Sequence, residues 1–187
     1  ILILSLNIRS LQRNSAELFA RLSELSPDIL VLTETWLDES FGSFTIPGYN
    51  CVGRLDRRDG RKAGGIAVYS RDLANCIVHL ADSHVDEHAW FALHTNMGPI
   101  LVGVWYRPPD YNNENLESLS EEFERYTANT IGCCLLGDFN IHHAKWLKYS
   151  AGNTAAGQWL QDWCQTHGII QGVHEPTRGD YLLDLVL

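Results

Sequence analysis

The sequence contains no apolar run close to the roughly 18 residues that cross a bilayer as a helix, so no membrane role is expected. Its five cysteines form no C-x-x-C pair and lack metal-ligand spacing, which argues against zinc and predicts reduced thiols in an intracellular protein. It has no internal repeat, low-complexity tract or basic segment of the kind that opens a signal peptide. We therefore expect residues 1–187 to be one domain, and the start on an apolar strand without Met predicts a fragment of a longer protein.

Positive charge is scarce in this chain. Fourteen Lys and Arg stand against 23 Asp and Glu, which gives a formal net charge of −9. This balance argues against a protein that binds nucleic acid through its overall charge alone. It does not exclude a nuclease, because a divalent cation held by carboxylates reverses the sign of the local charge.

One stretch departs from the acidic average. Residues 53–62 carry five basic and two acidic side chains, a local net charge of +3. A basic loop between strands is suited to contact a phosphate backbone, although a solvated charged turn is the plainer interpretation. The DNA contacts that we predict are Arg9, Arg54, Arg57, Arg58, Arg61, Lys62, Arg107 and Arg178.

The four residues from Gly137 to Asn140 follow an apolar run that is typical of a buried strand. Asp138 and Asn140 are two positions apart, so along a strand their side chains would point to the same side. Gly137 would leave room for a substrate backbone. An Asp can take a proton from water or bind a metal, and an Asn can donate to a phosphoryl oxygen without adding charge. The pattern favours hydrolysis of a phosphate ester, with an Asx turn after a strand as the alternative.

Two further polar residues end strands near the start of the chain. Apolar runs at residues 1–6 and 28–33 flank a helical pattern from Gln12 to Leu25, which predicts a βαβ unit. Asn7 and Glu34 follow these two strands, and ligands bind at such strand ends. An amide and a carboxylate suit a hard cation such as Mg²⁺. The alternative for Glu34 is a solvated acid at the start of a loop.

The remaining chain alternates between predicted strands and helices. We expect strands at residues 66–70, 76–80, 90–95, 100–106 and 181–187, helices at 112–129 and 153–167, and irregular structure at 36–49 and 53–62. Tyr106 ends a strand just before Pro108 and Pro109, which would fix the direction of a phenol able to donate to a phosphate. An aromatic that caps the core is the alternative. Asp184 lies within an apolar run and therefore needs a partner.

Five short blocks of the chain together carry a resemblance to a known family. They are Leu6–Ser10, Thr33–Trp36, Trp105–Pro109, Gly137–Asn140 and Leu183–Leu187. In order and spacing they resemble the endonuclease/exonuclease/phosphatase superfamily, across the whole of the chain. More narrowly, the chain resembles the apurinic-type endonuclease domain of non-LTR retrotransposon polyproteins.

The resemblance implies an α/β (α+β) fold, a four-layer sandwich of two mostly antiparallel sheets with helices on the outside. It implies that Glu34 is the principal ligand of Mg²⁺, or of Mn²⁺, with Asn7 assisting. Asp138 would orient or deprotonate the attacking water, and Asn140 and Tyr106 would hold the scissile DNA phosphate. The product would be a 3′-hydroxyl, formed in the nucleus. The partners would be the DNA target and, within the parent polyprotein, the retroelement RNA and reverse transcriptase domain.

One block of the family pattern is missing. The family ends in a Ser/Thr-Asp-His block one strand beyond Asp184, whose carboxylate would orient the His, but none of the eight histidines follows Asp184. We expect a truncated fragment that lacks its last strand, and loss of such a group costs about 10²–10⁴ in rate. Two alternatives are a phosphoesterase acting on inositol phosphates or lipid head groups and a non-catalytic DNA-binding remnant. The sequence leaves target preference and oligomeric state open.

Overall fold

The computed structural model describes residues 1–57, 63–71, 76–83, 87–109 and 114–187. Three of the predicted DNA contacts, Arg58, Arg61 and Lys62, lie outside these described residues. None of the helices in the described part of the chain is long and apolar enough to cross a membrane.

The first sheet is mixed. Its strands in spatial order are β1 (Ile3–Asn7), β2 (Ile29–Thr33), β4 (Ile66–Arg71) and β3 (Tyr49–Leu55). β1 and β2 run parallel and are joined by α1 (Leu11–Leu25), as the βαβ prediction requires, whereas the other pairs are antiparallel. Asn7 pairs with Thr33 across β1 and β2. Glu34, which directly follows Thr33, is therefore delivered next to Asn7.

The second sheet is also mixed. Its strands in order are β5 (Ile77–Asp82), β6 (Glu87–Thr95), β7 (Gly98–Tyr106), β8 (Gly132–Asp138) and β9 (Asp184–Val186). β7 and β8 run parallel, with α2 (Glu114–Thr127) between them in the chain, and α3 (Ala155–His167) follows β8. The register aligns Tyr106 with Asp138, and Asp138 with Asp184. Three predicted site residues thus lie side by side at one end of this sheet.

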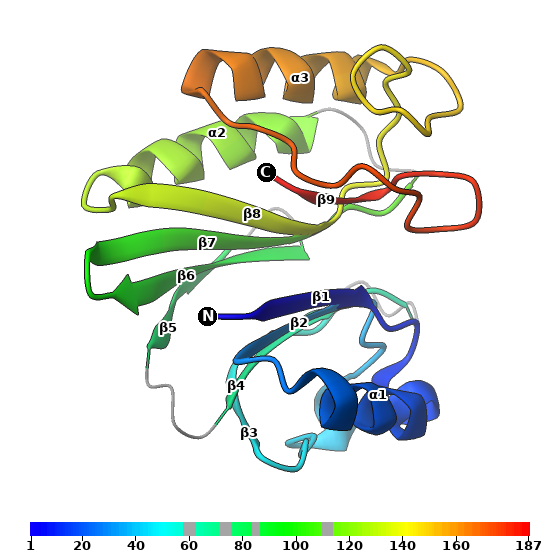
Figure 1. The fold of residues 1–187 in the computed structure, drawn as a ribbon, viewed down its shortest axis with the longest axis vertical. Helices are drawn as coiled ribbons and strands as arrows, with labels where there is room; N and C mark the ends of the chain where they lie inside the picture. Colours follow the sequence, from blue (N-terminus) through cyan, green and yellow to red (C-terminus); the bar gives the residue numbers. More distant parts are fainter. Residues whose placement is uncertain (58–62, 72–75, 84–86, 110–113) are drawn as a thin grey trace.

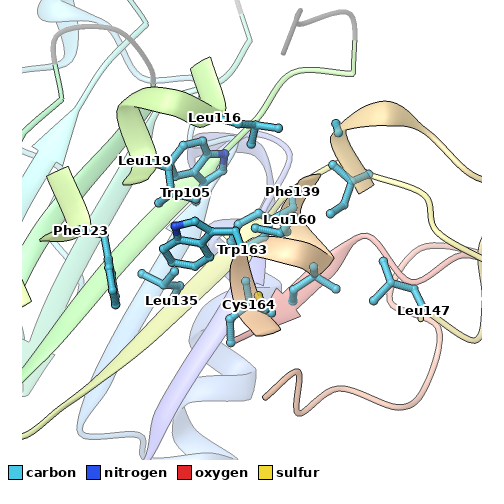
Figure 2. Packing of buried hydrophobic residues seen from close by; sticks show 14 of the residues in the cluster. Trp105, Leu116, Leu119, Phe123, Leu135, Phe139, Leu147, Leu160, Trp163 and Cys164 are labelled. Atoms are coloured by element: carbon cyan, nitrogen blue, oxygen red, sulfur yellow. The ribbon is translucent and has the colours of Figure 1, made fainter. Parts of the chain in front are cut away.

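The elements stack in four layers (Figure 1), with α2 and α3 over the second sheet and α1 under the first. Three apolar clusters fill the spaces between neighbouring layers. Figure 2 shows the cluster between the second sheet and its helices, where Phe123 of α2 meets Trp163 of α3 edge-on, with ring centroids 4.9 Å apart. The predicted fold class, two sheets with helices outside, is confirmed.

The helix ends follow capping rules. Ser10 caps α1 by accepting from the Arg13 N–H, and Thr154 caps α3 by accepting from the Gly157 N–H. Gly168 ends α3 in the left-handed conformation that glycine adopts without steric cost. Because Ser10 caps α1, the helix begins only four residues after Asn7, the last residue of β1.

One segment differs from the sequence-based expectation. β3 covers residues that we assigned partly to an irregular segment and partly to the basic loop. The strand pairs with β4 through a bulge between Cys51 and Gly53, and most of its residues are only partly buried. Both features interrupt the alternation that marks a strand, so the prediction of irregular structure was wrong for the residues of β3. The last strand is also shorter than predicted, covering only Asp184–Val186.

A buried polar network ties α2 to the second sheet. The carboxylate of Glu122 accepts hydrogen bonds from Ser83 Oγ at 2.9 Å and Trp90 Nε1 at 2.7 Å, and pairs with His88 Nε2 at 2.5 Å. Burial alone would raise the pKa of Glu122. The partners outweigh burial, led by the hydrogen bond to His88, and lower the pKa from 4.5 to about 2. The ionised form of Glu122 therefore stabilises the fold.

We expect Glu122→Gln to lower the free energy of unfolding at neutral pH by about 1–3 kcal/mol, because it weakens a buried charge-assisted network. A carboxyl group whose pKa falls on folding stabilises above its unfolded pKa and loses this effect as the pH falls through the folded pKa. The gap between wild type and variant should therefore narrow from pH 4.5 toward pH 2. Urea unfolding across this range measures the gap, and a gap independent of pH would contradict the prediction.

Candidate active site

Polar side chains from both sheets meet where four strands end. The side-chain amide of Asn7 donates from Nδ2 to Glu34 Oε1 at 2.9 Å and to Asp138 Oδ2 at 2.7 Å. Asn7 and Glu34 belong to the first sheet, and Asp138 ends β8 of the second. One amide group therefore bridges two carboxylates across the interface between the sheets.

Arg178 lies within this cluster. Its guanidinium pairs with Asp138 Oδ2, lies 3.5 Å from Glu34 Oε1 and donates to Asn140 Oδ1 at 3.4 Å. We predicted a DNA contact for this residue, and the structure places it among the predicted catalytic side chains. With 30% of its side chain exposed, the guanidinium combines contact with the acids and access to solvent.

Asn140 reaches the site by a different route from the one expected. β8 ends at Asp138, and Asn140 has a left-handed backbone with a φ of 45°. This turn, and not the alternation of a strand, brings the two side chains together. The amide Nδ2 of Asn140 donates to the carbonyl oxygen of Arg107 at 2.7 Å, which fixes the orientation of the side chain.

Gly137 also has a different role from the one expected. A Cβ on Gly137 would lie 1.9 Å from the carbonyl oxygen of Trp105 on the neighbouring strand β7. The missing side chain therefore permits close contact between two strands, and the space is not left for a substrate backbone. Its φ of 135° is a conformation that residues with a side chain rarely adopt.

Two carboxylates of the site, those of Asp138 and Asp184, lie in an environment that disfavours charge. Asp138 is fully buried, and burial raises its pKa to about 6, with the nearby Asp184 acting in the same direction and Arg178 opposing it. Burial also raises the pKa of Asp184, against the hydrogen bond with Thr177. Burial and then Glu34 raise the pKa of the Tyr106 phenol, which keeps it protonated and able to donate.

The donor set fits a hard divalent cation. Asn7 Oδ1 is buried and has no hydrogen-bond partner among the described residues, although it is an acceptor beside the carboxylate of Glu34. Oxygen ligands of this kind suit Mg²⁺ or Mn²⁺, which keep several waters when bound by only one or two protein groups. Within the described residues, no group of three or more His, Cys, Asp and Glu could hold a metal ion. Glu34 and Asn7 would offer such a cation one carboxylate and one amide oxygen.

Two of the predicted DNA contacts are buried. Arg57 pairs with Glu87 and lies over the ring of Tyr106, 5.9 Å from its centroid. Arg107 donates to the carbonyl oxygen of Asn140 at 3.3 Å. Both guanidinium groups therefore order the site from within, and neither presents an open surface to a phosphate backbone.

Two other predicted contacts lie nearer the surface. Arg54 pairs with Asp56 at 2.6 Å and donates to the carbonyl oxygen of Asp38 at 2.7 Å, so it is largely engaged with the protein. Arg9 is exposed and lines a pocket of about 420 Å³ that includes Asn7 and Arg21. Of the described residues assigned to DNA, Arg9 is exposed and Arg178 is partly exposed, so both remain accessible to a phosphate backbone.

Sequence reasoning missed two residues that contact this cluster. Trp36 Nε1 donates to Glu34 Oε2 at 3.3 Å, and the hydroxyl of Thr177 accepts from the N–H of Asp184 at 3.0 Å. Thr177 follows a proline in a turn-like stretch, which is a weak signal for such a bond. The contact of Trp36 depends on left-handed backbone at Glu34 and Trp36, which sequence pattern does not report.

The chain is similar to known proteins in both sequence and structure. The sequence profile described as "Endonuclease/Exonuclease/phosphatase family" matches residues 4–181. The endonuclease domain of TRAS1, a telomere-specific non-LTR retrotransposon, superposes with a TM-score of 0.71 and 18% identity, covering 98% of this chain and 82% of that one. The 3′-5′ exonuclease NExo from Neisseria meningitidis gives a TM-score of 0.64 and 21% identity, covering 100% and 86%. The AP endonuclease LMAP from Leishmania major gives 0.68 and 16%, covering 98% and 77%. No curated protein sequence matches significantly.

Two sheets packed face to face, with acids and amides gathered at their strand ends, form the fold that this chain shares with the TRAS1 endonuclease domain, NExo and LMAP. The match over residues 4–181 then identifies the chain as a member of the Endonuclease/Exonuclease/phosphatase family. The superfamily and the resemblance to a retrotransposon endonuclease domain, both predicted from the five blocks, are confirmed.

Proposed function

We propose that this chain is a Mg²⁺-dependent DNA endonuclease domain that nicks the target of a non-LTR retrotransposon and leaves a 3′-hydroxyl. The observation that carries the proposal is the bridge from Asn7 to both Glu34 and Asp138, which joins a metal-type ligand pair to a buried acid. The family membership and the fold shared with the TRAS1 endonuclease domain support it. In this proposal the partners are the DNA target and the RNA and reverse transcriptase domain of a parent polyprotein, acting in the nucleus.

Glu34 and Asn7 would hold the divalent cation, Mg²⁺ or Mn²⁺, through the Glu34 carboxylate and the buried Asn7 Oδ1. When bound, the cation supplies positive charge that stabilises the developing charge on the phosphate. Asn7 has a second task in this arrangement. Its Nδ2 hydrogen bonds keep the two carboxylates in place, and its Oδ1, which accepts no hydrogen bond from the described residues, stays available to the cation.

The remaining side chains would act on water and on the phosphodiester. Asp138 would accept a proton from the attacking water, as its oxygens lie at the centre of the cluster. The oxygen of this water bonds to phosphorus, the phosphorus–O3′ bond breaks and O3′ takes up a proton from solvent, so that the products are a 3′-hydroxyl and a 5′-phosphate. The phenol of Tyr106, whose raised pKa keeps it protonated, and a free N–H of Asn140 would donate to phosphoryl oxygens. The guanidinium of Arg178 would offset part of the negative charge.

A supercoiled-plasmid nicking assay tests this proposal. We expect Mg²⁺ to convert supercoiled plasmid to the open circle, EDTA to stop the reaction, and a DNA polymerase to extend the nick without prior treatment, because a 3′-hydroxyl is present. An inositol polyphosphate and a sphingomyelin vesicle serve as competing substrates. Cleavage of either of these without plasmid nicking would support the other phosphoesterase function, and salt-sensitive DNA binding without any cleavage would support a binding remnant.

A further inference from the structure

We propose that Trp36 is a positioning residue that orients the metal-binding carboxylate of Glu34. This inference rests on the proposed function of the site, because it assigns Glu34 to the cation. The two oxygens of the Glu34 carboxylate have different donors: Asn7 Nδ2 lies 2.9 Å from Oε1, and Trp36 Nε1 lies 3.3 Å from Oε2. Together the two donors fix the rotation of the carboxylate about its last bond.

The backbone around Trp36 is arranged to make this contact. Glu34 and Trp36 have φ values of 52° and 55°, left-handed conformations that are unfavourable for residues with large side chains. The N–H of Trp36 donates to the carbonyl oxygen of Gly64 at 2.9 Å, and that of Thr35 donates to Gly65 at 3.2 Å. Gly64 and Gly65, which directly precede β4, therefore hold the turn in place. Such local strain, where the surrounding structure enforces it, is typical of functional sites.

The side chain of Trp36 also has a neighbour on α1. Arg13 of α1 lies over the indole, with its guanidinium carbon 5.7 Å from the ring centroid. An indole N–H is a donor only, so Trp36 can orient a carboxylate but cannot replace it as a ligand. The hydrogen bond from Trp36 uses one lone pair of Oε2, so the second lone pair of this oxygen stays available to a cation. Partners of this kind, which orient a metal ligand, typically contribute about 10–100-fold to metal affinity.

Trp36→Phe isolates this contribution, because it removes the N–H and keeps an aromatic ring beneath Arg13. The matched control is Trp163→Phe, which removes another indole hydrogen bond, the one to Ser120 Oγ at 3.1 Å, in the layer of α2 and α3. Mn²⁺ binding to the full chain, followed by the electron paramagnetic resonance signal of free Mn²⁺, gives the dissociation constant for each protein. We expect Trp36→Phe to weaken Mn²⁺ binding about 10–100-fold and Trp163→Phe to leave it unchanged.

A second measurement covers the case in which a variant folds poorly. In the wild-type chain labelled with ¹⁵N-tryptophan, the indole N–H resonance of Trp36 should shift when Mg²⁺ is added, and that of Trp163 should not. Equal Mn²⁺ affinity of Trp36→Phe and wild type, an unmoved Trp36 resonance at saturating Mg²⁺, or no cation binding by the wild type would each overturn the inference. A wild type that binds Mn²⁺ but nicks no DNA would instead refute the proposed function and leave the positioning role standing.

Discussion

Asp138→Asn is expected to lower the rate of plasmid nicking by about 10²–10⁴-fold while the protein stays folded. The buried carboxylate accepts hydrogen bonds from Asn7 and Arg178, and a carboxamide of the same shape can neither take a proton from water nor balance the charge of Arg178. Glu34→Gln should cause a loss of similar size through weaker binding of the cation. Single-turnover nicking of supercoiled plasmid at saturating Mg²⁺ measures both effects.

Glu24→Gln is the matched control for these two substitutions. Glu24 lies on α1 with 65% of its side chain exposed and forms only a surface pair with Arg21. Such a surface pair contributes little to the stability of the fold, so the nicking rate of this variant should stay within about twofold of wild type. If Asp138→Asn nicked as fast as Glu24→Gln, Asp138 could not be the base, and the assignment of the site would have to move to other residues.

Sequence pattern identified the site residues that lie at the ends of apolar strands. Asn7 and Glu34 each follow such a run, and the helical pattern between the runs implied that these strands lie side by side, as the parallel pair of β1 and β2 shows. Tyr106 and Asp138 were also recognised as strand ends. Their pairing in register was not, because hydrophobic periodicity gives the position of a strand and not its neighbour.

Contacts between residues distant in the chain were beyond the reach of sequence pattern. Arg178 meets Asp138 across 40 positions of chain, and no local spacing relates the two. The left-handed backbone at Glu34 and Trp36 likewise occurs at residue types that rarely adopt it. At Asn140 the residue type is a weak signal, because Asn adopts this conformation more often than other residues with a side chain. The charge of residues 53–62 predicted a basic loop, but the side chain of Arg57 is buried against Glu87. Sequence pattern does not distinguish a buried ion pair from a solvated one.

Gly137→Ala is expected to lower the free energy of unfolding by about 2–6 kcal/mol. Strain at a φ of 135° contributes about 1–3 kcal/mol, and the overlap with the Trp105 carbonyl oxygen adds about 1–3 kcal/mol of overpacking. Gly132→Ala is the control in the same strand: no atom lies within 4 Å of its added Cβ, so its effect should stay within about 0.5 kcal/mol. Urea unfolding of the two variants measures the difference. Equal urea midpoints for the two variants would show that β7 and β8 can move apart with little loss of stability.

Gly137→Ala should also affect the reaction at the site. Relief of the overlap requires β8 to move away from β7 at Trp105, one residue before the pair formed by Tyr106 and Asp138. Any Gly137→Ala protein that still folds should therefore bind Mg²⁺, because Asn7 and Glu34 belong to the other sheet, yet nick DNA more slowly than wild type. Full nicking activity in a folded Gly137→Ala protein would mean that the spacing between Tyr106 and Asp138 does not matter for the reaction. The glycine would then serve the sheet alone.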